Sequence, residues 1–405
     1  MAKNVKVCVM TTRTKSNSNT HLRKANKAKN DEFYTQLVDI EKELKHYKEQ
    51  FKNKVVYCNC DDPFESNFFK YFASNFNALK LKRLIATSYK PSPIANTQLG
   101  LFGDDKTLGP IKGRPKTNAN KLIINEVKDL DGDGAFDLRD IAEQLKANKN
   151  NEWSPMENDG DFRSPESIEL LKQADIVVTN PPFSLFREYV SQLMDYNKKF
   201  LIIGNTNALT YKDIFKLVKD NKIRTGYTNF NVGMFFEVPK EWEKYHHIDE
   251  NGKKIARVST SCWFTNLDVE KHKQDIVLYK KYNEIDYPNY ENYKAIDISK
   301  VQEIPMDYKK EMGVPITFVD KYNPDQFEIV ALGIVGSIDF TKNRKMEILK
   351  DGKPTGKYTV NAKGTLYRKY NPERDEYPAF KDIETNNLYS SIYARIIIKN
   401  KKPLK

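Results

Sequence analysis

Long apolar segments are missing from this 405-residue sequence. None of its hydrophobic runs reaches the roughly 18 residues that a helix needs to cross a bilayer, so we expect no membrane span. A secretion signal is also missing, because Lys3 and Lys6 are followed by a polar stretch rich in Asn, Thr and Ser. These absences predict a cytoplasmic protein that does not act on membranes.

Cysteine is scarce. The chain has only Cys8, Cys58, Cys60 and Cys262, and no second Cys/His cluster has the spacing of a zinc site. Cys58 and Cys60 lie in one predicted strand, where alternate residues share a face. The sequence therefore predicts reduced, partly buried thiols and excludes a disulfide-based scaffold.

Acidic residues are missing from both ends of the chain. Residues 1–30 carry eight Lys or Arg and residues 395–405 carry five, with no Asp or Glu in either stretch. Since the formal net charge is +12, the rest of the chain is close to neutral. A near-neutral body with two basic ends suits an enzyme whose arms contact phosphates. For the N-terminal arm, a solubilising tail or an organelle transit peptide is the alternative.

Strand and helix patterns alternate over the first part of the chain, which predicts an α/β fold with a doubly wound parallel sheet. The length allows two or three domains. We divide the chain into a basic flexible arm, an α/β domain with an insertion, and a mixed α+β C-terminal region: 1–30, 31–240 with the insertion at about 90–160, and 241–405. The expected buried strands are 55–60, 81–87, 175–179 and 200–204.

The most informative motif is Asn180-Pro181-Pro182-Phe183, which directly follows the predicted strand 175–179. Open α/β sheets bind their ligands at the carboxyl ends of strands. Two successive prolines make a stiff loop whose carbonyls point in fixed directions. The motif therefore predicts a ligand-binding loop, and a turn that only ends the strand is the alternative.

These residue types suit chemistry on an exocyclic amine. The Asn180 side-chain carbonyl and the Pro181 backbone carbonyl could accept both hydrogens of an NH2 group, which favours the form with a localised lone pair. Phe183 offers a ring on which a base can stack, and stacking worth roughly 1–3 kcal/mol would offset part of the cost of flipping that base out of a duplex. In amino-methyltransferases a loop like this one presents the amine to a methyl donor.

A donor site is expected at the turn after the first strand, at Cys60, Asp61, Asp62 and Pro63. Asp62-Pro63-Phe64 resembles the Asp-Pro-Phe-x-Gly-x-Gly turn of amino-methyltransferases, but Ser66-Asn67-Phe68 replaces the usual glycines. Thr87-Ser88-Tyr89 also stands where an acidic residue usually holds the ribose hydroxyls of the donor.

Two further segments are candidates for donor binding. Gly160-Asp161-Phe162 fits the loop whose Asp accepts a hydrogen bond from the donor adenine, and a helix-capping turn is the alternative. Phe33, Tyr34 and Thr35 could pack on the methionine portion of the donor, and a helix start with core aromatics is the alternative.

A possible calcium loop lies within the insertion. Five carboxylates fall at loop positions 1, 3, 5, 9 and 12, with a glycine at position 6, as in an EF-hand that ends in Asp: Asp129, Asp131, Asp133, Asp137 and Asp140. The preceding residues 121–127 read equally as a strand, which would remove the helix–loop–helix context. An acidic surface turn is the alternative.

Taken together, several stretches resemble the EcoRI-type DNA adenine-N6 methyltransferases. The stretch 55–63 (VVYCNCDDP) is the most specific, because that family uses this variant turn without glycines. The other matching stretches are 31–36, 66–72, 160–162, 175–189, 200–203, 265–268, 312–318 and 323–328. The resemblance implies a Rossmann-like domain that binds S-adenosylmethionine and flips an adenine into the pocket of Asn180, Pro181, Pro182 and Phe183.

The resemblance also implies the wider context. The substrate would be a specific site in double-stranded DNA, residues 31–240 would be catalytic, and 241–405 would recognise the target. The protein would act as a monomer in restriction–modification, with a cognate endonuclease as a functional partner. An RNA or protein-glutamine methyltransferase could use the same loop, and a catalytically silent DNA-binding protein is a third possibility.

Overall fold

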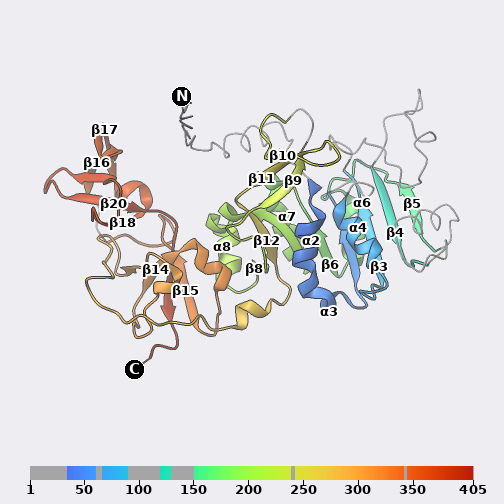
Figure 1. Cartoon of the computed structure of the whole chain (residues 1–405), viewed down its shortest axis with the longest axis horizontal. Coiled ribbons are helices and arrows are strands. Elements are labelled where there is room, and N and C mark those ends of the chain that lie inside the picture. The colour runs from blue at the N-terminus through green and yellow to red at the C-terminus, as the bar shows by residue number, and fades with distance from the viewer. Residues whose placement is uncertain are drawn as a thin grey trace, which may run out of the picture.

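The computed structural model describes residues 34–60, 66–89, 119–128, 150–238, 242–341 and 344–404. A mixed eight-stranded sheet dominates the N-terminal two thirds of the chain (Figure 1). Its strands lie in the order β5 (Glu152–Pro155), β4 (Asn120–Ile124), β3 (Arg83–Thr87), β2 (Val55–Cys58), β6 (Ile176–Thr179), β7 (Lys199–Asn205), β12 (Ser261–Thr265) and β8 (Arg224–Thr225).

The predicted α/β class is confirmed, but the prediction of a parallel sheet is correct only for its centre. Strands β3, β2, β6 and β7 are parallel, whereas β4 and β5 on one side and β12 and β8 on the other pair antiparallel. Strands β4 and β5 come from the predicted insertion, which therefore contributes to the sheet. Strand β12 lies in the same sheet although it follows the division that we placed at residue 240.

Helices cover both faces of this sheet. Helices α2 (Leu37–Leu44) and α4 (Asn67–Ser74) pack on one face, and α6 (Pro165–Gln173), α7 (Phe186–Asp195) and α8 (Lys212–Lys219) pack on the other. Between α2 and β2 lie a 3₁₀ turn, η1 (Lys45–Tyr47), and the short helix α3 (Lys48–Phe51). Alternate residues of β2 enter different cores, because successive strand side chains point to opposite faces.

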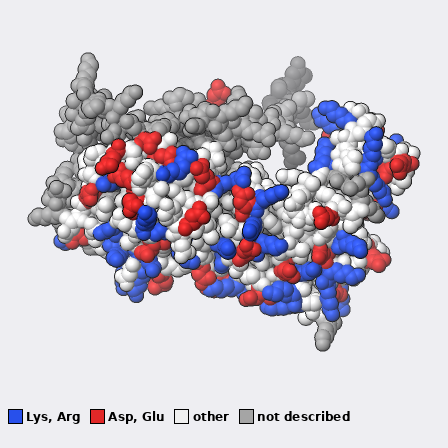
Figure 2. Space-filling model, turned by 180° about the vertical axis from the view of Figure 1, so that it is seen from behind, with Lys and Arg blue, Asp and Glu red and all other residues white. Residues whose placement is uncertain are grey.

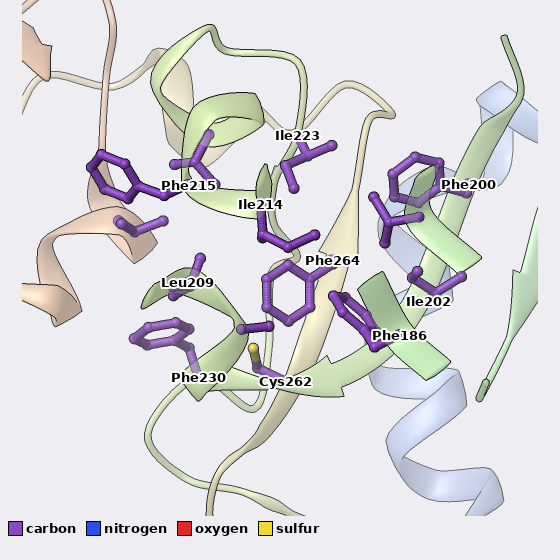
Figure 3. Packing of buried hydrophobic residues seen from close by; sticks show 14 of the residues in the cluster. Phe186, Phe200, Ile202, Leu209, Ile214, Phe215, Ile223, Phe230, Cys262 and Phe264 are labelled. Atoms are coloured by element: carbon purple, nitrogen blue, oxygen red, sulfur yellow. The ribbon is translucent and has the colours of Figure 1, made fainter. Parts of the chain in front are cut away.

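The core on the α7 side depends on one glycine. A Cβ on Gly204 of β7 would lie 2.4 Å from the Phe186 ring, so only glycine lets this ring lie against the strand. The Phe186 ring then packs 5.0 Å from the Phe264 ring of β12, beside the buried Cys262 thiol (Figure 3). Burial raises the pKa of Cys262, which keeps this thiol protonated.

A separate small sheet includes the first described residues of the chain. Its strands are β1 (Tyr34–Thr35), β9 (Met234–Val238), β11 (Lys254–Val258) and β10 (His247–Ile248), in that order and all antiparallel. The short strand β1 thus joins the N-terminal segment to a part of the chain about 200 residues later.

The described residues from 242 onward form strands and 3₁₀ helices but no α-helix, so the predicted mixed α+β character of the C-terminal region is wrong for them. One sheet consists of β13 (Ile296–Asp297), β14 (Met312–Pro315), β21 (Arg395–Asn400) and β15 (Phe327–Leu332). The other consists of β17 (Lys353–Val360), β16 (Lys345–Lys350), β19 (Phe380–Asp382), β20 (Leu388–Ile392) and β18 (Leu366–Lys369).

The five-stranded sheet is inserted between two strands that are neighbours in space. Strands β15 and β21 pair with each other, and strands β16 to β20 lie between them in sequence. Where the chain leaves β15 and enters β21, the Gly333 amide donates to the Arg395 carbonyl at 2.8 Å. The two ends of the inserted segment therefore meet.

The basic C-terminal end is not the free arm that its charge predicted. The buried side chains of Ile396, Ile397 and Ile398 place this segment in the middle of the four-stranded sheet. Two of its cations have carboxylate partners: Lys399 pairs with Glu311 at 3.1 Å, and Lys402 with Asp275 at 3.0 Å. The predicted N-terminal arm, residues 1–30, lies outside the described residues. No helix in the described parts of the chain is long and apolar enough to cross a membrane.

A buried carboxylate ties α2 to the loop before β9. The Glu43 side chain is fully buried and accepts four hydrogen bonds: from Tyr47 Oη at 2.7 Å, Tyr227 N at 2.7 Å, Thr228 N at 2.8 Å and Thr228 Oγ1 at 2.6 Å. Burial raises the pKa of the Tyr47 hydroxyl, with the Glu43 charge adding to the effect, so this hydroxyl stays a donor. A carboxylate suits this site because every partner donates.

Replacing Glu43 by Gln should destabilise the protein by about 3 kcal/mol, because the amide NH2 would face donors where the carboxylate now accepts. Urea unfolding followed by circular dichroism measures this change. Glu41→Gln, on the exposed face of the same helix, is the matched control and should change stability by less than about 0.5 kcal/mol. Equal stability of the two variants would contradict the importance of the Glu43 contacts.

Candidate active site

The carboxyl ends of the two central strands are joined through Asn59, which follows β2. Thr179, the last residue of β6, donates its hydroxyl to the Asn59 carbonyl. Tyr189 of α7 donates its hydroxyl to Asn59 Oδ1 at 2.5 Å. All three side chains are buried, and burial raises the pKa of Tyr189, so this phenol stays a hydrogen-bond donor. The loops that follow β2 and β6 are thereby held side by side.

The Asn180–Phe183 loop begins directly after Thr179. Asn180, Pro181 and Pro182 are buried, whereas Phe183 is half-buried and starts the 3₁₀ helix η2 (Phe183–Leu185) that leads into α7. The Pro182 carbonyl accepts from the Leu185 amide at 2.9 Å, which closes this turn. The loop therefore lies at the carboxyl edge of the sheet, as its sequence predicted.

The ring of Phe183 lies against the small sheet. Its centroid is 6.3 Å from the ring centroid of Phe236 in β9, in an edge-to-face arrangement. Edge-to-face pairs of this kind stabilise by about 0.5–1.5 kcal/mol beyond the area that they bury. Phe236 thus orients Phe183, a contact that the sequence did not indicate because the two residues lie 53 positions apart in different elements, η2 and β9.

A small hollow, partly open to solvent, adjoins the loop. Four of the predicted site residues line it: Cys60, Asp161, Phe162 and Pro182. The hollow is completed by Tyr89, Gly160 and Leu185. The structure thus brings together the segments after β2, β3 and β6 with the loop before α6, although they are far apart in sequence.

Tyr89 and Leu185 also line the hollow, and neither was predicted as a site residue. Tyr89 follows β3 at the place where an acidic residue was expected, and the missing acid was the one available signal for it. Leu185 belongs to η2, and only the turn after Pro182 brings it to the hollow.

Cys60 has an unusual backbone conformation. Its φ is +76°, in the left-handed region that residues other than glycine, asparagine and aspartate seldom adopt. This turn places Cys60 in the core on the α7 side, whereas Cys58 belongs to the core on the α2 side. The prediction that the two cysteines share a face is therefore wrong, because the strand ends at Cys58.

Gly160 fixes the segment that carries Asp161 and Phe162. Its φ is +78°, and a Cβ there would lie 2.0 Å from the Ser88 carbonyl oxygen. No other residue could pack this closely on the chain that follows β3. The Phe162 ring is buried and lies edge-on to the Tyr189 ring, with centroids 5.0 Å apart.

The Asp161 carboxylate is held by Arg163. Arg163 donates from Nε to Oδ1 at 2.8 Å and from Nη2 to Oδ2 at 2.6 Å, and it also contacts Glu188 of α7 at 3.2 Å. The Arg163 backbone N–H also donates to Oδ1 at 2.8 Å, so the carboxylate accepts three hydrogen bonds. These hydrogen bonds lower the pKa of Asp161, so its carboxylate is ionised at neutral pH. No pattern in the sequence indicated Arg163 as a site residue.

Tyr34 and Thr35 do not line the hollow. They form β1 against β9, and the Thr35 carbonyl accepts from Asn67 Nδ2 at 2.7 Å, at the start of α4. This places β1 beside the chain that follows the predicted donor turn. The other predicted donor residues, Phe33, Asp61, Asp62 and Pro63, lie outside the described residues.

The predicted calcium loop also lies outside the described residues: Asp129, Asp131, Asp133, Asp137 and Asp140. The segment before it is the strand β4, not the first helix of an EF-hand, and this removes the context that the motif requires. No cluster of His, Cys, Asp or Glu suited to a metal ion occurs in the described ranges. Nothing in the structure supports a calcium site.

Comparisons with known proteins place these features in one family. The family model of the adenine-specific methyltransferase EcoRI matches residues 21–401. The Type II methyltransferase M.EcoRI of Escherichia coli is 47% identical over 318 residues, which cover 77% of this chain and 89% of that protein. No solved structure gives a significant match.

Two mycoplasma proteins are also similar. The Type II methyltransferase M.MgeORF184P of Mycoplasma genitalium is 38% identical, and M.MpnI of Mycoplasma pneumoniae is 37% identical. Each match spans 317 residues, which cover 76% of this chain and 85% of the relative. The chain therefore belongs to the EcoRI family of adenine-specific methyltransferases.

Proposed function

We propose that this protein transfers a methyl group from S-adenosylmethionine to the N6 amino group of adenine within a specific site of duplex DNA. The observation that supports this proposal is that the candidate donor site and the candidate target site share one residue. Pro182 belongs to the loop that would hold the target amine, and it also lines the hollow formed by Cys60, Asp161 and Phe162. Donor and acceptor would meet across this proline.

The residues of the hollow suit the adenosine part of the donor. Its walls are mostly apolar or aromatic, and the Asp161 carboxylate supplies an ionised acceptor for an amino group. Tyr34 and Thr35, beside the start of α4, would contact the methionine part. When bound, S-adenosylmethionine supplies an electrophilic methyl group on a sulfonium.

The target amine would be held by the loop after β6. The Asn180 side-chain carbonyl and the Pro181 carbonyl accept its two hydrogens, and the Phe183 ring, oriented by Phe236, stacks on the flipped adenine. Positioning and local electrostatics then supply most of the rate. No strong general base is required, because the proton can leave after the amine has become cationic.

Duplex DNA is the proposed acceptor for two reasons. The relatives are Type II methyltransferases, and residues 1–30 carry eight cations and no acid, which suits contact with phosphates. We propose that residues 31–240 provide the catalytic domain, that 241–405 recognise the target, and that the protein acts as a monomer in restriction–modification alongside a cognate endonuclease.

The deciding experiment is methyl transfer from labelled S-adenosylmethionine to unmethylated genomic DNA, followed by sequencing that reports N6-methyladenine in its sequence context. We expect label at one recurrent motif. Label on RNA or protein in place of DNA, with the donor still bound, would overturn the proposed acceptor.

Replacing Asn180 by Ala should lower kcat by at least about 100-fold, because one of the two acceptors for the amine is lost. The dissociation constant of S-adenosylmethionine should stay the same within about twofold, since Asn180 is not among the residues that line the hollow. Asn207→Ala, an exposed asparagine in the 3₁₀ helix η3 (Thr206–Thr210), is the control. If the kcat of Asn180→Ala equals that of Asn207→Ala, the role assigned to Asn180 is refuted.

Replacing Asp161 by Ala should weaken S-adenosylmethionine binding about tenfold, because an ionised acceptor in the hollow is removed. Isothermal titration calorimetry measures the affinity, and a thermal melt checks the fold. Glu157→Ala, an exposed carboxylate in the same segment, should leave the affinity unchanged. Equal affinities of the two variants would show that Asp161 does not bind the donor.

A further inference from the structure

The hairpin of β16 and β17 is a tightly closed ribbon. Lys350 pairs with Lys353, so only Asp351 and Gly352 form the turn, and their φ values are +50° and +76°. Positive φ at both central residues defines a type I′ turn, whose twist matches that of the two strands. The tip of the ribbon therefore has a defined shape.

Strand β17 is the edge of the five-stranded sheet, and among the described strands it pairs only with β16. Seven of its eight residues are exposed, and Thr359 is half-buried. The register shifts between Glu347 and Leu349, opposite Gly356, whose φ is +68°. An edge strand with an irregular register and several lysines does not readily pair with another strand.

Three of the four side chains on the outer face of the ribbon can make hydrogen bonds. Lys345 pairs with Val360 and Glu347 with Tyr358, so these four side chains share the face opposite the buried Met346. The side chains of Tyr358 and Val360 are 55% and 53% exposed. Lys345 Nζ lies 5.5 Å from the centre of the Tyr358 ring.

The ribbon carries four lysines. No carboxylate of the described residues lies within ion-pair distance of Lys345, Lys350, Lys353 or Lys357. This differs from the C-terminal strand, where Lys399 has a carboxylate partner. Figure 2 shows Lys and Arg side chains on the projecting part of the molecule that this sheet forms. The ribbon therefore presents positive charge, which favours binding to an anionic partner.

Glu347 helps to distinguish two kinds of contact with DNA. It shares the outer face with Lys345 and has no basic partner within ion-pair distance among the described residues. A carboxylate is repelled by phosphates, but it can accept a hydrogen bond from the amino group of cytosine in the major groove. The combination of Lys345 and Glu347 on one face therefore favours contact with base edges.

The ribbon projects on the side of the molecule where the catalytic loop lies. In Figure 1, α2 runs downward to α3, so the following strand β2 runs upward and its carboxyl end lies at the upper edge of the sheet. Strands β16 and β17 project upward at the far end of the molecule. One DNA duplex lying along this side could contact both parts.

We propose that the β16–β17 ribbon enters the major groove of the DNA substrate and that Lys345 and Glu347 read base edges there. The major groove is about 12 Å wide and admits a two-stranded β-ribbon. Lys345 would donate to guanine, Glu347 would accept from cytosine, and the lysines near the tip would contact phosphates. This inference rests on the proposed function, and it assigns sequence recognition to one continuous segment.

The test compares Lys345→Ala and Glu347→Gln with the wild-type protein on duplexes that carry its methylated motif or any single base-pair change of it. We expect each variant to lose about 10-fold to 100-fold of the discrimination at one position of the motif. Affinity for S-adenosylmethionine and the melting temperature should not change. Lys52→Ala, an exposed lysine after α3 at the opposite edge of the sheet, is the matched control.

Three results would overturn the inference while leaving the proposed function intact. The first is that both variants rank the duplexes by methylation rate in the same order as the wild-type protein does. The second is an equal loss of rate on every duplex with a smaller dependence on salt, since this marks phosphate contacts. The third is that the protein dimerises through β17 and that a change in dimerisation explains any loss of discrimination in the variants. If the wild-type protein methylates no DNA, the proposed function itself fails.

Discussion

The position of Asn59 is the constraint on which the candidate active site depends. Its backbone carbonyl accepts from Thr179 at the end of β6, and its side chain accepts from Tyr189 of α7. A single residue therefore fixes the distance between the loop that would hold the donor and the loop that would hold the target. Both donors are buried, so water does not compete for these bonds.

A second set of contacts links helix α2 to the loop that follows β6. Glu43 of α2 holds the backbone at Tyr227 and Thr228, and this loop leads into β9. Strand β9 carries Phe236, whose ring orients Phe183. The small sheet is thus a support for the proposed base-stacking ring.

Local patterns in the sequence predicted the elements that depend on nearby residues. The strand before Asn180 and the loop of Asp161 and Phe162 were found because apolar runs and turn residues indicate them directly. The antiparallel strands β4 and β12 were not recognised as parts of the main sheet, because their partners lie far away along the chain. Arg163 was not selected because its role depends on the turn that brings it to Asp161.

The meeting of Gly333 and Arg395 has a consequence for how proteins of this kind can diversify. A segment whose two ends are hydrogen-bonded neighbours can be replaced by another with similar ends, because the strands on either side keep their pairing. Strands β16 to β20 thus form a cassette in the chain. Under the proposed function, recombination within one gene would exchange this cassette and so give the same methyltransferase sheet a new target sequence in one step.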